Sequence, residues 1–278
     1  MKTIAITGAT SGIGEEAAVA FARAGHRILL IGRDRERGAA ALARVQEAGR
    51  RAQHKLHLAD LSLVREARRL ADTLAYEETR LDVLANNAGA IFEAREETGE
   101  GVERTFATDH LGAWALTDAL MPLLRSSESR VVQTSSIAHR GARLDPDDWQ
   151  LRRGWSSWRA YCNAKLMNLL MTRELRRREA RLTAVAFHPG FIASRFGTGA
   201  QGMSGLAGVA QRLVGKSPEA GAATLIHLAT ADLGRDPALY WADRKPARAS
   251  RQAEDDGLAT KLWAESARLS GHVAAVPA

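Results

Sequence analysis

Along most of its length the chain alternates short apolar runs with longer stretches of helical periodicity, and this alternation narrows the possible folds more than any other feature. The runs expected to form strands span residues 3–7, 27–31, 52–58, 81–86, 130–135 and 182–187, with a weaker one at 238–241. Helical patterns between them include 13–24, 34–48, 63–75 and 161–178. Strands that alternate with helices join through right-handed crossovers into a parallel sheet covered on both faces. We therefore predict an α/β fold: a single doubly wound domain over residues 1–278, with a central parallel sheet of about seven strands and helices on both faces.

The basic balance of the chain, a net charge of +7, is of the kind that nucleic-acid-binding proteins carry. The arginines are nevertheless scattered over helix faces and accompanied by acidic residues, as in the stretch 173–179. The sequence also has no zinc-knuckle, basic-arm or aromatic ribonucleoprotein pattern. We therefore expect solvated helix faces and no nucleic-acid partner.

Cysteine usage and the N-terminus bear on the compartment. The one cysteine, Cys162, excludes an intrachain disulfide, and we interpret it as a small residue inside a helix rather than a reactive thiol. No apolar run approaches the length that spans a bilayer, and Lys2 and Thr3 lead directly into the first strand pattern without a signal peptide. We expect a cytoplasmic protein without a membrane anchor. We assign no metal site.

A glycine-rich turn, Thr7–Gly14, follows the first strand and precedes a helix. Glycines let the backbone approach a pyrophosphate, and the free N–H groups and positive dipole of the helix N-terminus favour the anion. The turn alone is a weak indication, but its place in a strand–turn–helix unit strengthens it. The cofactor-binding residues predicted in this turn are Gly8, Ser11, Gly12, Ile13 and Gly14.

The pattern T-G-x-x-x-G-x-G in this turn resembles that of the short-chain dehydrogenase/reductase family, and Asn86-Asn87-Ala88-Gly89 after the fourth strand matches the N-N-A-G motif of the family in full. The resemblance implies a Rossmann-like domain and a nicotinamide cofactor. It also implies that Asn86, Asn87, Ala88 and Gly89 support and line the cofactor site, and that Asp60 and Leu61 contact the adenine. Asp60 or Ser62 could also cap the helix over 63–75, and for Asp60 the two roles are compatible.

The end of the second strand, Gly32-Arg33-Asp34, bears on the choice of cofactor. An acidic residue here would accept hydrogen bonds from the free 2′-hydroxyl of NAD, whereas an arginine pairs with the 2′-phosphate of NADP. Gly32 falls where NAD-preferring relatives carry Asp, and Arg33 where NADP-preferring relatives carry Arg. We therefore predict NADP(H) rather than NAD(H), with Asp34 capping the next helix.

Three residues form the predicted catalytic group: Ser136, Tyr161 and Lys165. Tyr161 and Lys165 share a helix face because they lie four residues apart. A phenol has a pKa of about 10, and a nearby ammonium lowers this pKa by favouring the phenolate. Lysine can also bind the nicotinamide ribose, and the Ser136 hydroxyl can orient and polarise a carbonyl. The Y-x-x-x-K spacing says little alone, but it follows the other motifs in the order seen in the family.

Asp109 departs from the family pattern, since many relatives carry Asn there to order a water that leads to the lysine. We include Asp109 in the catalytic group on the hypothesis that it keeps the proton relay working with a shifted pH profile.

The stretch after the sixth strand, His188–Ser194, looks like the family's P-G-x-x-x-[ST] segment beside the nicotinamide. We expect His188 to be structural, because Tyr161 already fills the acid–base role. The resemblance places four further cofactor contacts here: Pro189, Gly190, Ile192 and Ser194.

The resemblance covers roughly residues 3–270 and is nearest to the retinol-dehydrogenase-like branch, on the segments 137–139, 217–222 and 261–266. Vertebrate members of that branch often begin with a membrane anchor, which we do not carry over. We expect residues 3–135 to form mainly the cofactor half, and residues 136–278 to supply the catalytic helix, the substrate loop and the C-terminal part. Relatives often pair through their long helices, so a homo-oligomer, dimer or tetramer, is also expected.

Two segments, 137–160 and 190–215, interrupt the alternation of strands and helices, and their aromatic residues bear on the class of substrate. Either they form an apolar lip around a bulky hydrophobic aldehyde, ketone or secondary alcohol, or they pack the loops. These residues are Trp149, Trp155 and Trp158, with Phe191, Phe196 and Met203 in the glycine-rich stretch 190–215. That stretch would order over a bound substrate.

The sequence therefore predicts an NADP(H)-dependent oxidoreductase that interconverts a carbonyl and an alcohol by hydride transfer. Two alternatives stay open on the same fold. One is a non-enzymatic NADP-binding regulator, and the other is an epimerase or a reductase that acts on a different bond, such as an activated carbon–carbon double bond.

Overall fold

The computed structural model describes residues 1–190 and 217–271. In this part of the chain eight strands form one sheet in the order β3-β2-β1-β4-β5-β6-β7-β8. All neighbours are parallel except the antiparallel pair β7–β8. The strands are β1 (Thr3–Thr7), β2 (Arg27–Gly32), β3 (Lys55–Leu58), β4 (Val83–Asn86), β5 (Arg130–Thr134), β6 (Thr183–His188), β7 (Tyr240–Ala242) and β8 (Lys245–Pro246).

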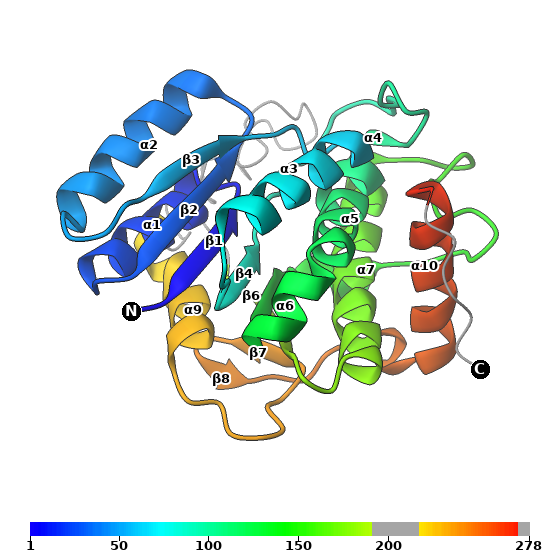
Figure 1. Cartoon of the computed structure of the whole chain (residues 1–278). Coiled ribbons are helices and arrows are strands. Elements are labelled where there is room, and N and C mark those ends of the chain that lie inside the picture. The colour runs from blue at the N-terminus through cyan, green and yellow to red at the C-terminus, as the bar shows by residue number, and fades with distance from the viewer. Residues whose placement is uncertain (191–216, 272–278) are drawn as a thin grey trace.

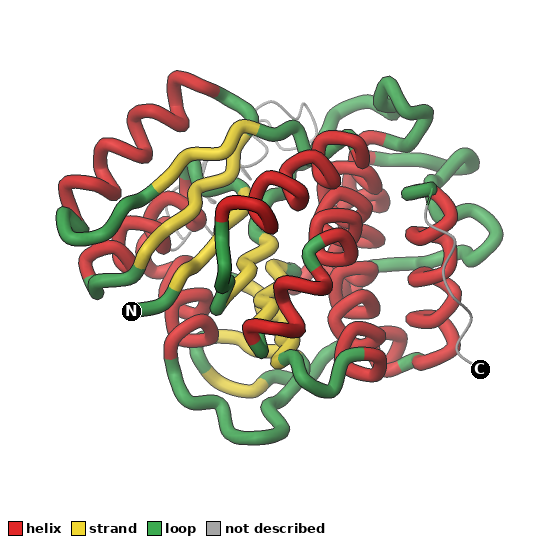
Figure 2. Tube along the Cα trace, in the orientation of Figure 1, coloured by secondary structure: helices red, strands yellow, loops and turns green. Residues whose placement is uncertain are grey.

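Helices cover both faces of this sheet, as Figures 1 and 2 show. One face carries α1 (Gly12–Arg23), α2 (Arg35–Ala48) and α9 (Pro218–Thr230). The other carries α3 (Val64–Glu77), α5 (Gly112–Ala119), α6 (Met121–Ser127), the end of α7 (Ser157–Arg178) and α10 (Asp256–Leu269). Shorter elements are α4 (Arg104–Phe106), the π-helix η1 (Ala107–Leu111) and the 3-10 helices η2 (Ile137–Gly141) and η4 (Arg251–Glu254).

Alternate side chains of the strands divide between two apolar cores. Ile4 and Ile6 of β1 pack with α1, α2 and α9, whereas Ala5 between them packs with α3 and α5. Because both faces are buried, the strands appear in the sequence as continuous apolar runs rather than as an apolar–polar alternation. The predicted single α/β domain with its covered parallel sheet is therefore confirmed.

Most boundaries lie within two residues of the prediction, two differ by three or more, and the short antiparallel β8 is additional. The third strand begins at Lys55 rather than at residue 52, because the buried His54 ring stops the run. Its Nδ1 accepts the Ile28 N–H (3.1 Å) and its Nε2 donates to the Gly49 carbonyl (2.8 Å). The helix that carries Tyr161 begins at Ser157, because the hydroxyl of Ser156 caps it by accepting the Arg159 N–H.

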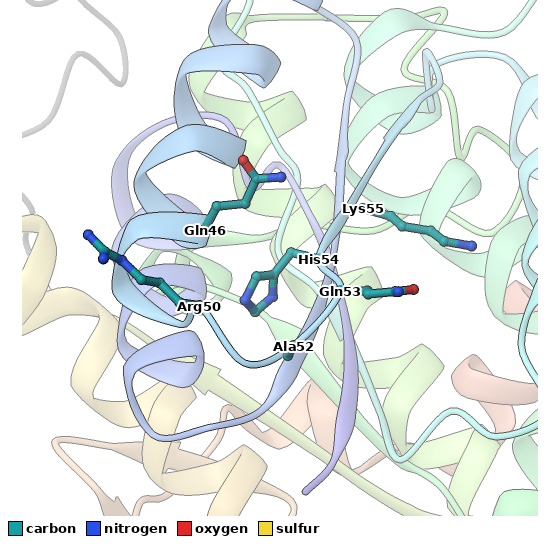
Figure 3. A pocket seen from close by; sticks show the side chains of 6 residues that line it. All are labelled: Gln46, Arg50, Ala52, Gln53, His54 and Lys55. Atoms are coloured by element: carbon teal, nitrogen blue, oxygen red, sulfur yellow. The ribbon is translucent and has the colours of Figure 1, made fainter.

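A hollow of about 460 Å³ lies where α2 ends and β3 begins (Figure 3). It lies at the amino end of β3, whereas open α/β sheets bind ligands at the carboxyl ends of their strands. None of the residues that the sequence assigned to a site lines it. The lining residues are Gln46, Arg50, Ala52, Gln53, His54 and Lys55.

The C-terminal helix α10 forms an outer layer against α7 (Figure 1). Trp263 packs edge-on against Trp114 of α5, with ring centroids 5.3 Å apart, and His110 Nε2 lies 2.9 Å from Ser266 Oγ. Through these contacts α10 packs on the largely buried segment 107–119 and stabilises its position. Within the described ranges, no helix combines the length and apolarity that crossing a membrane requires.

Removing the Trp263 ring should therefore loosen this layer. We expect Trp263→Ala to lower the free energy of unfolding by about 3 kcal/mol, because the buried ring leaves a cavity against Trp114. Denaturant titration measures the loss. Lys261→Ala, an exposed position on the same helix, is the control and should change it by less than about 0.5 kcal/mol.

Candidate active site

The carboxyl ends of β1, β4 and β5 are tied together by Asn87. Its Nδ2 donates to the Thr7 carbonyl (3.1 Å), and its Oδ1 accepts from the Thr134 hydroxyl (3.4 Å). The Thr7 hydroxyl oxygen accepts the N–H groups of Asn87 and Ala88, each at 2.9 Å. The preceding Asn86 points to α5, where it donates to Thr117 Oγ1 (2.9 Å). The N-N-A-G segment thus ties the sheet at the edge where ligands of this fold bind.

In the glycine-rich turn, Gly8 and Gly14 are packed closely against other backbone atoms, whereas Gly12 borders open space. A Cβ on Gly14 would lie 2.3 Å from the Gly8 carbonyl oxygen, and a Cβ on Gly8 would lie 2.9 Å from Ala88 Cα. A Cβ on Gly12, which has a φ of +58°, would meet nothing within 4 Å. Ser11 makes no side-chain cap on α1. Among the described residues, the N–H groups of Gly12 and Ile13 have no acceptor, so an anion such as a pyrophosphate fits here.

At the end of β2, Gly32 lies against Thr10. A Cβ at position 32 would come within 2.4 Å of Thr10 Cγ2, so an acidic side chain there would require Thr10 to move. Arg33 is exposed, and its guanidinium has no ion-pair partner in the described ranges. Asp34 accepts the Arg37 N–H (2.9 Å), which confirms the predicted cap of α2.

Asp60 and Ser62 do not cap α3, so the predicted cap is wrong. The Asp60 carboxylate instead accepts the Ser62 N–H (3.0 Å) in a tight turn. Glu100 supplies the cap from a distant loop, because it accepts the N–H groups of Val64 (2.7 Å) and Arg65 (3.2 Å). Leu61 is buried. Its carbonyl oxygen lies so close to Gly112 that a Cβ on that glycine would be 1.9 Å away from it. Glu100 was not predicted as this cap, because no local sequence pattern links it to α3.

The predicted catalytic hydroxyls and the lysine come together where β5 meets α7. Ser136 begins η2, where its Oγ accepts the Ala138 N–H (3.2 Å), and its hydroxyl also hydrogen-bonds to Tyr161. The Ser135 hydroxyl donates to the Lys165 carbonyl (2.8 Å) and so fastens α7 to β5. Lys165 Nζ lies 5.2 Å from the centroid of the Tyr161 ring.

Asp109 contacts Lys165 directly. The two form an ion pair with 2.7 Å between Oδ2 and Nζ, and their side chains are 0% and 3% exposed. The other carboxylate oxygen of Asp109 accepts the Ala90 N–H (2.7 Å). A Cβ on Gly89 would lie 2.9 Å from Nζ and 3.0 Å from Oδ2 of Asp109, so a side chain at this position would displace the pair. Asp109 lies in the π-helix η1, a local widening of the helix that is common at functional sites.

The charges in this cluster oppose one another. Burial favours the neutral amine of Lys165, but the charges of Asp109 and Tyr161 outweigh burial and raise the pKa of Lys165. Burial also raises the pKa of Tyr161, and Asp109 adds to this rise, while Lys165 and the Ser136 hydrogen bond act against it. The site therefore holds a protonated lysine beside a protonated phenol at neutral pH.

The segment after β6 is described only as far as Gly190, which has a φ of +90°. The N–H of Gly190 donates to His188 Nδ1 (3.1 Å), and the His188 ring packs on Tyr240 with centroids 5.8 Å apart. These contacts agree with a structural role for His188. Pro189 is half-buried beside it. The predictions for Phe191, Ile192, Ser194, Phe196 and Met203, and for ordering of the glycine-rich stretch, lie outside the described residues.

The three tryptophans predicted at a pocket lip differ in their surroundings. Trp149 is buried in the core between α7 and α10, and the Trp155 N–H donates to Glu103 Oε1 (3.1 Å). Only Trp158 is largely exposed. The buried Cys162 has a pKa raised to about 11 by burial, as expected for an unreactive thiol.

Comparison with known proteins identifies the family. The family model for short chain dehydrogenase matches residues 2–202. Human retinol dehydrogenase 13 is 38% identical over 284 residues, which cover 97% of this chain and 85% of that protein. A proposed daunorubicin C-13 ketoreductase of Streptomyces sp. (strain C5), DnrU, is 36% identical over 277 residues, 98% of this chain and 94% of that protein.

A solved structure gives the same result. A short chain dehydrogenase of Escherichia coli CFT073, crystallised with NADPH, is 25% identical with a TM-score of 0.68, covering 86% of this chain and 94% of that one. The chain belongs to the short-chain dehydrogenase/reductase family, and it is an oxidoreductase that acts on CH–OH or C=O groups.

Proposed function

We propose that this protein uses NADP(H) to interconvert hydrophobic aldehydes or ketones and their alcohols, with Tyr161 as the proton donor and acceptor. The observation that carries the proposal is the cluster of the half-buried Ser136 with the buried Tyr161 and Lys165 at the carboxyl edge of the sheet, beside the open glycine-rich turn. The names of its relatives, a retinol dehydrogenase and a ketoreductase, support a hydrophobic alcohol or ketone as substrate.

The side chains divide the work of the reaction. Bound nicotinamide supplies or accepts the hydride. Ser136 and Tyr161 donate hydrogen bonds to the carbonyl oxygen, and Tyr161 then transfers its proton to that oxygen during reduction. Lys165 stabilises the phenolate that remains, because its ammonium lies beside the Tyr161 ring. In alcohol oxidation the same groups act in reverse, with the Tyr161 phenolate accepting the proton.

The cofactor would lie along the edge formed by the turn and the ends of the strands. The N–H groups of Gly12 and Ile13 would bind the pyrophosphate, and the second carboxylate oxygen of Asp60 would suit an adenine amino group. Lys165 would also hold the nicotinamide ribose. The other residues assigned to this site are Gly8, Ser11, Gly14, Leu61, Asn86, Asn87, Ala88, Gly89, Pro189, Gly190, Ile192 and Ser194. In this proposal residues 3–135 form mainly the cofactor half.

The choice of NADP(H) over NAD(H) depends on the end of β2. Arg33 is exposed there without a partner in the described ranges, and Gly32 leaves no side chain to bind a ribose 2′-hydroxyl. A guanidinium in this position suits the 2′-phosphate.

Asp109 is assigned as a positioning residue that acts through Lys165. It holds the ammonium in place and keeps it charged, and its own negative charge raises the pKa of Tyr161. Asp109 therefore favours the protonated phenol that carbonyl reduction requires. The other titratable neighbours are Cys162, whose thiol is neutral, and Glu103, whose charge adds to the rise in the pKa of Asp109.

A cytoplasmic location and a homo-oligomer remain predictions. The face of α7 that packs against α10 is not free for pairing, so a dimer would have to use another surface. Light scattering of the purified protein would settle the oligomeric state.

Replacing the proton donor tests the mechanism. Tyr161→Phe should lower kcat for NADPH-dependent reduction of hydrophobic aldehydes and ketones by about a hundredfold or more, while NADPH still binds. Tyr76→Phe, an exposed tyrosine at the end of α3, is the control. NADPH binding without turnover of any carbonyl by the wild-type protein would favour the regulator alternative, and product analysis would reveal an epimerase or a double-bond reductase.

Arg33→Ala tests the choice of cofactor. Loss of a charge-assisted bond to the 2′-phosphate should weaken NADPH binding by about tenfold or more and leave NADH binding unchanged. Arg51→Ala removes an equal charge near the amino end of β3 and should change neither affinity. Equal or tighter NADH binding by the wild-type protein would contradict the NADP assignment.

Asp109→Asn tests the positioning role through the pH profile. The variant removes a charge that raises the pKa of Tyr161, so this pKa should fall. Because alcohol oxidation needs the Tyr161 phenolate, its kcat/KM decreases as the pH falls through that pKa. We expect this decrease in kcat/KM to occur at lower pH in the variant.

The control is Glu174→Gln, a buried carboxylate at the far end of α7 that pairs with Arg177 and Arg178. It should leave the profile in place. If Asp109→Asn lowers kcat/KM without shifting its pH dependence, Asp109 has only a structural role.

A further inference from the structure

Two large apolar side chains border the catalytic cluster without being covered. Trp158 is 58% exposed and Ile137 is 38% exposed, and the other large exposed apolar residues of the described ranges are Met1 and Tyr76. Water contact with apolar surface is unfavourable by about 25 cal/mol per Å². Exposed apolar groups gathered in one place therefore often mark a surface that binds a ligand.

The positions of these two side chains follow from their elements. Trp158 lies in the first turn of α7, and its ring centroid is 6.0 Å from that of Tyr161, with the ring planes inclined by 35°. Ile137 directly follows Ser136 at the start of η2, which packs against α7. Each hydroxyl that would bind the carbonyl oxygen thus has an exposed apolar neighbour.

Trp158 is also held on a fixed backbone. The Ser156 hydroxyl caps α7 by accepting the Arg159 N–H (3.3 Å), and Arg159 Nη1 donates to the Gly154 carbonyl (3.0 Å). A side chain on a capped helix keeps its direction better than one on a loop. Unlike Trp155, whose N–H is bound to Glu103, the Trp158 indole has no hydrogen-bond partner among the described residues.

A carbonyl oxygen bound by Ser136 and Tyr161 brings the substituents of its carbon close to these apolar neighbours. The face of an indole packs best on a flat π system in an offset or tilted arrangement. We propose that Trp158, together with Ile137 beside Ser136, determines specificity for carbonyl compounds that carry a flat aromatic or conjugated group directly on the carbonyl carbon. This inference rests on the proposed function, since it takes Ser136 and Tyr161 as the groups that bind the carbonyl oxygen.

A pair of ketones with the same carbon skeleton tests it: acetophenone, which carries a flat ring, and cyclohexyl methyl ketone, which carries a puckered one. With NADPH and the full chain, the wild-type protein should have the higher kcat/KM for acetophenone. Trp158→Ala should lower that value by about tenfold and change the cyclohexyl value by less than about twofold. Trp158→Phe, which keeps a flat ring, should retain most of the preference. Tyr76→Ala, another exposed aromatic position, should leave both values unchanged.

Calorimetric binding of the same ketones to the NADP⁺ complex gives a comparison that does not need turnover. Tighter binding of acetophenone by the wild-type protein, lost in Trp158→Ala, would support the inference even if the proposed reaction failed. An equal loss for both ketones, or no loss for either, would overturn it and leave Trp158 as a packing residue. Turnover that disappears in Tyr161→Phe while the Trp158 comparison shows no difference would uphold the reaction and reject this specificity.

Discussion

The buried ion pair between Lys165 and Asp109 is the constraint around which the site is built. Burying a charge is costly unless a partner and further hydrogen bonds compensate it, so each side chain stabilises the buried charge of the other. The pair lies against Gly89, which leaves room for it, and against the Ala90 N–H, both in the loop after β4. Three segments that are distant in the chain must therefore meet before the lysine can be placed beside Tyr161.

Support for this pair reaches outward to the surface. Glu103 caps α4, which leads directly into η1 with Asp109, and its carboxylate accepts two N–H groups of α4 and the Trp155 indole N–H. Next to Asp109, His110 contacts Ser266 of α10, and burial lowers the His110 pKa to about 4, which keeps its ring neutral. The outer helix and the loop before α7 thus belong to the machinery that positions the lysine, although they lie away from the reacting atoms.

Around this ion pair, the exposed side chains differ from the buried and half-buried ones in whether they bind to other groups of the protein. Arg33 at the end of β2 and Trp158 on α7 extend to solvent without hydrogen-bond or ion-pair partners in the described ranges, while Asn87, Ser135 and Asp109 are bound by the protein itself. Groups bound by the protein fix geometry, whereas free groups at an edge can recognise a ligand. This division separates the residues that would set the chemistry from those that would set the choice of cofactor and substrate.

The sequence by itself determined the sheet, the glycine-rich turn, the N-N-A-G segment and the shared face of Tyr161 and Lys165, because each depends on local periodicity or short spacing. Only the tertiary structure decided which distant groups meet: Asp109 with Lys165, Glu100 with the start of α3, and Trp155 with Glu103. It also decided that Trp149 is buried while Trp158 is exposed. Side chains from separate segments pair through packing in three dimensions, which leaves no periodic trace along the chain.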